Sequence, residues 1–267
     1  MTERRRSLFE EFSLDAPHVT ETRRLLQTLA REDREGRHRA YMVTSATRGE
    51  GKSTVCALTA IVAAKIFRRK VLLIDTDFRR PAIHHLLGCS QRRGLFDLLN
   101  GRATLDEVTF ATPVPTLSAI VTGRVSGSMS EAYRDEAFGD LMRDLRSQYD
   151  LILLDSAPVV PVIEPLMIAE HVDAVILVAM AGKTPVTMIR RMRQVIVPVE
   201  HKVVGAILNN AINGLPYYYD YRYYGYERPK PHRFRSRKET PADPGGPPRK
   251  DPGQPGNDRA ARQRGGA

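Results

Sequence analysis

The sequence predicts a doubly wound α/β fold, in which a mostly parallel β-sheet carries helices on both faces. The first observation is a series of short runs that are apolar almost throughout, as in strands buried on both sides. The second is that these runs alternate with helical patterns, which is the order of βαβ units. The third is that polar side chains follow the strands at their carboxyl ends, where such sheets bind ligands; they are Ser45, Asp75, Asp77 and Asp155.

Strands and helices follow one another along most of the chain. Apolar runs bounded by turn signals predict strands at residues 40–46, 70–77, 116–123, 149–158, 173–180 and 202–211. Apolar periodicity predicts helices at residues 19–32, 54–67, 81–87, 94–101, 131–148 and 184–196. The alanine-rich helix at 54–67 has apolar residues on nearly every face, which is typical of a helix buried on all sides.

The 267 residues are enough for one large domain with its own core. We expect a flexible leader at 1–17, a folded domain at 18–214, a tyrosine-rich segment at 215–227 and a tail at 228–267. The tail holds eleven Lys or Arg and four Asp or Glu, so it carries +7 of the formal net charge of +10. Eight prolines, six glycines and few apolar groups predict that the tail is disordered.

Composition and spacing exclude several classes of protein. Cys56 and Cys89 lie far apart and match neither a disulfide framework nor a metal-binding spacing. The longest apolar runs, such as residues 174–181, are too short to span a bilayer, and the charged N-terminus has no apolar signal core. We therefore expect a cytoplasmic protein with both thiols reduced.

A phosphate-binding loop lies between the first strand and the alanine-rich helix. The stretch ATRGEGKS (46–53) fits the P-loop pattern, with alanine in place of the first glycine. Gly49 and Gly51 let backbone N–H groups approach the phosphates, Lys52 reaches the β- and γ-oxygens, and Ser53 offers its hydroxyl to Mg²⁺. The alternative is a turn that only links strand to helix. The expected ATP-binding residues here are Ala46, Thr47, Arg48, Gly49, Glu50, Gly51, Lys52, Ser53 and Thr54.

Three aspartates stand at the ends of the second and fourth strands. Asp75 and Asp77 are two residues apart, so their side chains would share one face of an extended segment. Neighbouring carboxylates repel unless a cation or a proton neutralises them, and Mg²⁺ beside a triphosphate would do so. Asp155 ends the run LILLD in the Walker B position, where an aspartate holds the metal. The alternative for Asp75 and Asp77 is a solvated pair at a strand end.

Five stretches together resemble the bacterial tyrosine kinases, the autokinases of capsule and exopolysaccharide export. They are TSATRGEGKST (44–54), KVLLIDTDFRRPAIHHLLG (70–88), GLFDLLNG (94–101), YDLILLDSAPVV (149–160) and VVGAILNNA (203–211). The most specific element is the apolar run followed by D-x-D-x-R, here Asp75, Asp77 and Arg79, which resembles the modified Walker motif of that family. The related MinD and ParA ATPases carry a signature lysine where this chain has Thr47, which argues against that branch.

This resemblance implies a P-loop NTPase fold and a protein-tyrosine kinase that uses ATP and Mg²⁺. Lys52 would bind the phosphates, and Ser53, Asp77 and Asp155 would surround the metal. Asp75 would act as the base or orienter for an incoming tyrosine hydroxyl. The implied catalytic residues are therefore Lys52, Asp75, Asp77 and Asp155.

The resemblance also implies self-association. The family's E-x-x-R-x-x-R motif of ring assembly is present as Glu21 and Arg24, with Gln27 in its third position. A common aspartate of the family appears here as Glu164. Glu21 and Arg24 are therefore the expected oligomerisation residues.

The tyrosine-rich segment holds seven of the ten tyrosines in the chain. In the family resembled, such a cluster is the autophosphorylation site and is offered in trans to a neighbouring subunit. Gly214, Pro216 and Gly225 favour the flexible tether that an acceptor needs. The implied acceptors are Tyr217, Tyr218, Tyr219, Tyr221, Tyr223, Tyr224 and Tyr226.

An alternative function is a P-loop ATPase that acts as a spatial organiser or binds single-stranded nucleic acid and modifies no protein. Tyrosines interleaved with basic residues favour such binding, because bases stack on aromatic rings. The carboxylates upstream disfavour nucleic acid as a partner. A third alternative is an aromatic segment that simply packs on the domain.

The adenine contact and the partners follow from the resemblance. Asn209 or Asn210 would contact the base, although an asparagine pair that only forms a turn explains the residues equally well. The resemblance implies a separate transmembrane polysaccharide co-polymerase as activator, and a cognate phosphotyrosine phosphatase. The protein would lie at the inner face of the cell membrane through the activator, where the basic tail would meet anionic lipid.

Overall fold

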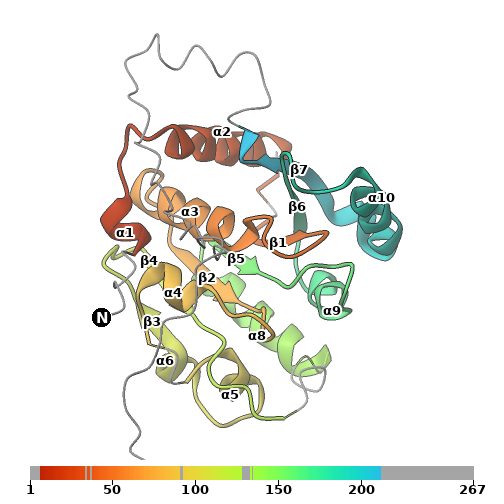
Figure 1. Cartoon of the computed structure of the whole chain (residues 1–267). Coiled ribbons are helices and arrows are strands. Elements are labelled where there is room, and N and C mark those ends of the chain that lie inside the picture. Colours follow the sequence, from red (N-terminus) through yellow and green to blue (C-terminus); the bar gives the residue numbers. More distant parts are fainter. Residues whose placement is uncertain are drawn as a thin grey trace, which may run out of the picture. The chain divides into compact units, whose positions relative to one another are not determined.

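The computed structural model describes residues 7–33, 35–36, 38–90, 93–127, 133 and 135–211. The chain divides into two units, residues 1–227 and 228–267, and every described residue belongs to the first. The described part is built around one sheet of seven strands (Figure 1). These are β1 (Ala40–Ser45), β2 (Val71–Asp75), β3 (Thr109–Ala111), β4 (Leu117–Ile120), β5 (Leu151–Asp155), β6 (Ala174–Met180) and β7 (Val203–Asn209).

The strand order is β3-β4-β2-β5-β1-β6-β7, and all neighbours pair in parallel except β3 and β4. Strands β1, β2 and β5 are buried along their whole length, because helices cover them on both faces. The doubly wound α/β prediction is confirmed. The antiparallel strand β3 was not predicted, because three residues give no readable periodicity.

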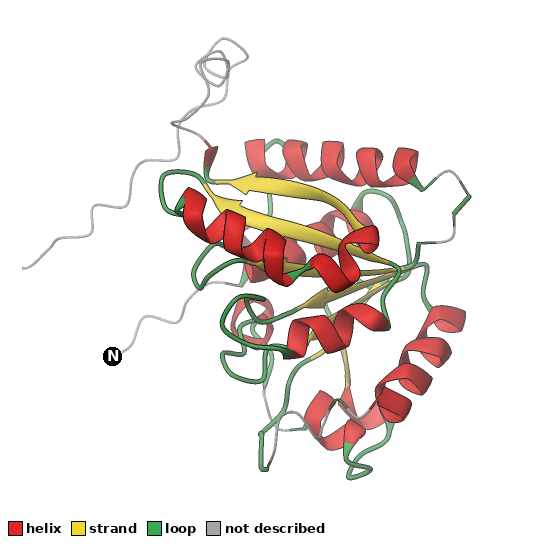
Figure 2. Ribbon diagram, turned by 90° about the vertical axis from the view of Figure 1, so that its right-hand side faces the viewer, coloured by secondary structure: helices red, strands yellow, loops and turns green. Residues whose placement is uncertain are grey.

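The helices form a layer on each face of the sheet (Figure 2). One core cluster joins alternate strand residues such as Val43 and Leu73 to α1 (Leu8–Glu11), α2 (Pro17–Glu32), α3 (Lys52–Lys65) and α4 (Ile83–Leu87). The other joins the intervening residues, such as Met42 and Leu72, to helices of the opposite layer. These are α5 (Leu95–Leu99), α6 (Leu105–Val108), α8 (Asp135–Gln148), α9 (Glu164–Glu170) and the 3₁₀ helix η1 (Val197–Lys202); α10 (Val186–Val195) lies beside β6 and β7.

The stretch expected as a flexible leader contains the short helix α1. Its neighbourhood is apolar: Leu8, Phe9 and Phe12 pack against the core, and the Lys65 ammonium lies 4.4 Å from the centre of the Phe12 ring. These partly buried contacts order α1, although charged residues dominate the sequence around it. Within the described residues, no helix combines the length and the apolar character that crossing a bilayer needs.

Candidate active site

The P-loop joins the carboxyl end of β1 to the N-terminus of α3. Gly49 and Gly51 adopt φ values of 73° and 86°, the left-handed region that a Cβ disfavours. A Cβ on Gly49 would also lie 2.6 Å from the Lys183 Nζ, and one on Gly51 would collide with the Asn209 side chain. Conformation therefore favours glycine at both positions, whereas the contacts with Lys183 and Asn209 involve the ends of side chains that can shift.

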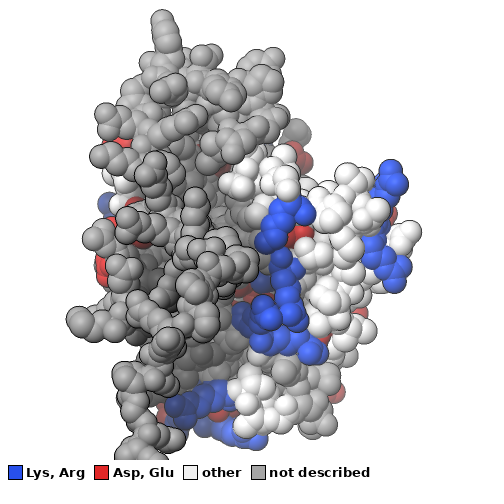
Figure 3. Space-filling model, in the orientation of Figure 1, with Lys and Arg blue, Asp and Glu red and all other residues white. Residues whose placement is uncertain are grey.

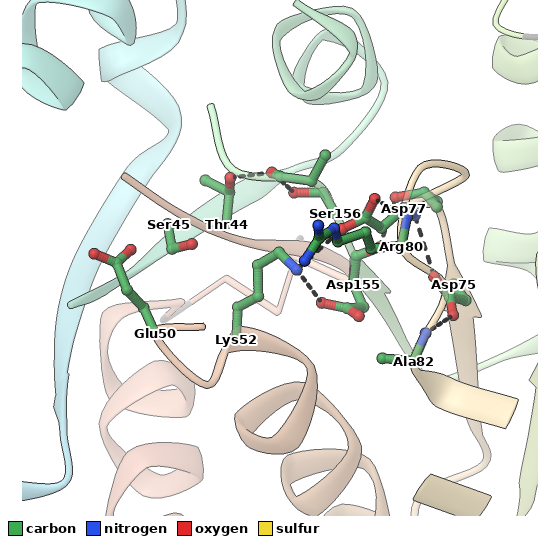
Figure 4. Close-up of polar contacts among 12 residues, drawn as sticks. Thr44, Ser45, Glu50, Lys52, Asp75, Asp77, Arg80, Ala82, Asp155 and Ser156 are labelled. Carbon is green, nitrogen blue, oxygen red and sulfur yellow. Dashed lines mark hydrogen bonds and ion pairs between the residues drawn. The ribbon is translucent and has the colours of Figure 1, made fainter. Parts of the chain in front are cut away.

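Lys52, the first residue of α3, points toward two carboxylates. Its Nζ donates a hydrogen bond to the Asp77 Oδ2 at 3.2 Å and lies 3.9 Å from the Asp155 Oδ1 (Figure 4). Burial alone would lower the pKa of Lys52, but the negative charges of Asp155 and Asp77 outweigh it and raise the pKa. The lysine stays charged and ready for phosphate oxygens.

Asp75 and Asp155 stand side by side, because they are paired in register at the ends of β2 and β5. Burial, together with the negative charge of Asp155, raises the pKa of Asp75 to about 8. Burial also raises the pKa of Asp155 to about 6, and the charge of Lys52 offsets part of this effect. Two buried carboxylates and one lysine leave the site short of positive charge.

Asp75 and Asp77 do not present one shared face, because β2 ends at Asp75 and the chain then turns. The Asp75 carboxylate accepts hydrogen bonds from the backbone N–H groups of Asp77, Ala82 and Ile83 at 2.9 to 3.1 Å. Asp77 instead accepts the hydrogen bond of Lys52. Figure 4 shows the result: Asp75 turned toward Ala82, and Asp77 toward Lys52. Asp75 thus fixes the loop that positions Asp77.

The residues present fit a hard divalent cation beside a nucleotide. Both oxygens of Asp155 are buried and have no hydrogen-bond partner in the described structure. Such orphaned carboxylate oxygens are suited to Mg²⁺ or to its bound water. The described residues hold no group of three or more His, Cys, Asp or Glu side chains that could bind a metal by themselves. The cation would depend on the phosphates for its remaining ligands, as Mg²⁺ in nucleotide sites does.

Basic side chains surround the mouth of the site. Figure 3 shows Lys and Arg gathered in the middle of this face of the molecule. Arg48, Arg79, Arg80 and Lys183 are exposed residues of the loops at the carboxyl edge of the sheet. Positive charge at this edge attracts an anionic ligand such as a nucleotide triphosphate.

Comparisons with known proteins agree with this geometry, although no family model matches the chain. The tyrosine-protein kinase Wzc of Salmonella typhi is 32% identical over 197 residues, which are 72% of this chain and 27% of that protein. The crystal structure of the VpsO kinase domain is 30% identical, with a TM-score of 0.64, and the match covers 72% of this chain and 93% of that domain. This chain belongs to the bacterial tyrosine kinase family.

Two further findings limit what family membership says about this chain. The match covers only about a quarter (27%) of the length of Wzc and of the putative tyrosine-protein kinase EpsB of Ralstonia solanacearum. The septum site-determining protein MinD of Pyrococcus horikoshii, complexed with Mg-ADP, is 24% identical with a TM-score of 0.54, covering 64% of this chain and 69% of that one. The likeness to MinD concerns the fold alone.

A group of contacts that sequence reasoning missed holds the P-loop from outside, although one of the residues, Asn209, was predicted as an adenine contact. Lys183 and Thr184 follow β6: the Lys183 Nζ donates to the Gly49 carbonyl at 2.8 Å, and the Thr184 hydroxyl donates to the Glu50 Oε1 at 2.6 Å. Asn209, at the end of β7, donates to the Glu50 carbonyl at 3.0 Å. We call Lys183, Thr184 and Asn209 the P-loop brace.

Glu50 lies at the centre of these contacts. Its carboxylate is buried and accepts hydrogen bonds from the Thr47 N–H and hydroxyl, both at 2.9 Å, as well as from Thr184. The sequence predicted Glu50 only as a member of the phosphate loop. Its side chain instead ties the loop to itself and to the end of β6. The GKS tripeptide at 51–53 gives no signal of this contact.

Other predicted residues are placed as follows. Asn209 lies against the P-loop, and Asn210 adopts φ 57°, so the pair combines a loop contact with a turn. Glu21 and Arg24 lie on α2 and form an ion pair at 2.7 Å. Arg79 binds Glu164 at 2.7 Å and so connects the loop after β2 to the start of α9. The seven clustered tyrosines and the tail lie outside the described residues.

A buried tyrosine also belongs to the site. Tyr133 stacks on Phe78 with ring centres 4.9 Å apart, and its hydroxyl donates to the Thr76 carbonyl at 2.6 Å. Burial raises its pKa well above the ordinary value, so the phenol stays protonated. Tyr133 therefore supports the loop between Asp75 and Asp77. No periodicity in the sequence singles it out.

Proposed function

We propose that this chain is a protein-tyrosine kinase that transfers the γ-phosphoryl group of ATP to the tyrosines at 217–226 of another copy. The observation that carries the proposal is the arrangement of Lys52, Asp75, Asp77 and Asp155 at one sheet edge directly beyond a P-loop. The names of the relatives Wzc and VpsO support it. The P-loop and the buried carboxylates of Asp77 and Asp155 beside Lys52 support ATP and Mg²⁺ as the ligands.

The residues would divide the chemistry as follows. Backbone N–H groups of the P-loop and the Lys52 ammonium hold the β- and γ-phosphates. Ser53, Asp77 and Asp155 would hold Mg²⁺, directly or through water; the cation neutralises charge on the phosphates when bound. Lys52 is released from Asp77 as the phosphate oxygens replace that carboxylate.

Asp75 would receive the proton in the transfer. The phenol oxygen bonds to the γ-phosphorus, the bond from the γ-phosphorus to the bridging oxygen of ADP breaks, and the phenolic proton passes to the Asp75 carboxylate. With a pKa of about 8, Asp75 is a better proton acceptor than an ordinary aspartate. The carboxylate is fully buried, so the acceptor would reach it only if the loop after β2 moved aside.

The decisive experiment is incubation of the purified full chain with γ-labelled ATP and Mg²⁺, followed by phosphoamino-acid analysis. We expect label on tyrosine, and a loss of at least about 100-fold in Lys52→Met, because the charge on the γ-phosphate is then uncompensated. Arg191→Met, which removes an exposed arginine of α10, is the matched control.

Replacing the seven clustered tyrosines with phenylalanine should remove most of the label and leave ATP binding unchanged. Full labelling of that variant would place the acceptor elsewhere. ATP turnover without any phosphotyrosine would instead support a spatial organiser or polyanion-binding ATPase.

We further propose that the activity depends on partners at the membrane. A separate transmembrane co-polymerase of polysaccharide export would activate the kinase, a phosphotyrosine phosphatase would reverse its action, and self-association through the Glu21–Arg24 region of α2 would bring acceptor and site together. The ion pair of Glu21 and Arg24 on an exposed helix face supports the last point. Addition of the cytoplasmic segment of such a co-polymerase should increase labelling; no increase would contradict this dependence.

A further inference from the structure

The sheet ends at β7 with an edge that has no partner strand among the described residues. Beside it, β6, β7, α10 and η1 enclose an apolar groove of about 520 Å³. On β7, Ala206 and Leu208 line this groove, because they pair in register with Leu177 and Ala179, which face it from β6. Leu208 is nevertheless 56% exposed, so the outer wall of the groove is open.

The chain itself continues from this edge. After Asn209, only seven residues, 210–216, separate β7 from Tyr217. A link of this length suits an antiparallel return, since a parallel connection needs a dozen or more residues. The link has turn residues: Asn210 adopts φ 57°, and Asn213 and Gly214 follow. Pro216 would stand just before the returning strand, where its missing N–H removes no ladder hydrogen bond.

The two faces of an extended segment at 217–224 differ in composition. Every odd position from 217 to 223 is tyrosine, whereas the even positions are Tyr218, Asp220, Arg222 and Tyr224. Such a stretch has one aromatic face and one more polar face, the pattern of a strand that is half buried. Tyrosine has a high strand propensity, and its hydroxyl can hydrogen-bond at the edge of an apolar site. Arg193 and Glu200 line the groove and offer such partners.

We propose that residues 217–224 dock on the unpaired edge of β7 as an antiparallel strand, with Tyr217, Tyr219, Tyr221 and Tyr223 facing the groove beside α10. The returning strand runs from the carboxyl edge of the sheet, where the P-loop lies, toward the opposite edge. Docking therefore leads the tyrosines away from the phosphate-binding end of their own chain.

The regulatory role of this docking rests on the proposed kinase function. A docked tyrosine is withheld from the active site of a neighbouring copy. A phosphotyrosine carries about −1.5 to −2 charges, and its return to the groove is disfavoured because Arg193 is the only cation among the described lining residues, which are otherwise apolar or, as Glu200, acidic. Phosphorylation would therefore hold the segment in the undocked state, while dephosphorylation would allow it to dock again.

The test is amide hydrogen exchange of the unphosphorylated full chain, which needs neither ATP nor kinase activity. Amides of Val203–Asn209 should exchange about tenfold more slowly in the full chain than in a chain that ends at Gly214. Leu208→Glu should remove this protection. Leu14→Glu, the same change at a residue that is 60% exposed and lies before α2, should leave it intact.

A second pair of variants tests whether the odd-numbered tyrosines are the ones that face the groove. Tyr219→Lys with Tyr221→Lys should abolish the protection of β7, whereas Tyr218→Lys with Tyr224→Lys should retain it. Equal exchange in the full and shortened chains overturns the proposal, as does protection that grows with protein concentration, which would identify a second copy as the occupant. Loss of phosphotyrosine labelling with protection intact would refute the kinase function and leave the docking established.

Discussion

Burial raises the pKa of Asp155 to about 6 even though the Lys52 ammonium lies 3.9 Å away, so the ionised carboxylate destabilises the fold. Asp155→Asn should therefore stabilise the nucleotide-free protein. The pKa is raised to about 6 in the fold, so the cost of ionisation appears as pH rises above the unfolded value and is complete above about pH 6. We expect a gain on the order of 1–3 kcal/mol at pH 8 that shrinks toward zero near pH 4.

Thermal unfolding of both proteins from pH 4 to pH 8 measures this gain. Asp150→Asn, a change at an exposed aspartate just before β5, is the control. A gain that is independent of pH would mean that the charge of Asp155 is not its source. The Asp155→Asn variant should no longer phosphorylate tyrosine, because the proposed metal ligand is removed. Stability and activity would then change in opposite directions.

Asp75 makes the proton transfer dependent on pH. A base must be ionised, and burial together with the charge of Asp155 raises the pKa of Asp75 to about 8. We expect kcat/KM for phosphorylation to rise about tenfold per pH unit below pH 8 and to level off above it. Measurement of initial rates from pH 6 to pH 9.5 gives the profile. A flat profile, or the same limb in the residual activity of Asp75→Asn, would exclude Asp75 as the base.

At the scale of elements, the P-loop depends on β6 and β7 for its shape. Thr184 accepts a hydrogen bond from the Met180 N–H and donates one to Glu50, so it connects the end of β6 to the loop. Thr184→Val keeps the shape of the side chain but leaves the buried Glu50 carboxylate without this donor. We expect the KM for ATP to rise about tenfold with a smaller change in kcat, since a hydrogen bond to a charged group contributes about 1.5–3 kcal/mol.

Thr184→Ser is the matched variant, because it retains the hydroxyl. It should restore the KM for ATP to within about threefold of the original, as the contact to Glu50 is regained. Steady-state kinetics across ATP concentrations separates the two parameters. If serine and valine raise the KM equally, the methyl packing of Thr184 matters and the hydroxyl does not.

The sequence predicted those elements whose signal is local. Strands β1, β2 and β5 are apolar throughout, and GKS after a strand specifies the loop and the start of α3. The brace by Lys183, Thr184 and Asn209 was not predictable, because it joins residues 134 and 159 positions apart through the sheet. The orientation of Asp75 was missed for a related reason: its partners, Ala82 and Ile83, come from a turn that has no periodic pattern.

At the scale of the whole molecule, transfer in trans requires one copy to supply the site and another the tyrosines. Asn209 contacts the P-loop, and the tyrosines begin eight positions later in the sequence. A proposed docked segment leads away from that site. If the proposed docking holds, a neighbouring copy is the expected catalyst.

Two complementary variants test this division. Lys52→Met keeps the tyrosines and lacks the phosphate lysine, while the variant with seven phenylalanines keeps the site and lacks the acceptors. Neither variant should become strongly labelled on its own. When mixed with labelled ATP and Mg²⁺, they should place phosphotyrosine on the Lys52→Met chain, at a rate that falls with dilution because the two chains must meet. Labelling of the unsubstituted chain that is independent of concentration, with no label in the mixture, would show transfer within one chain.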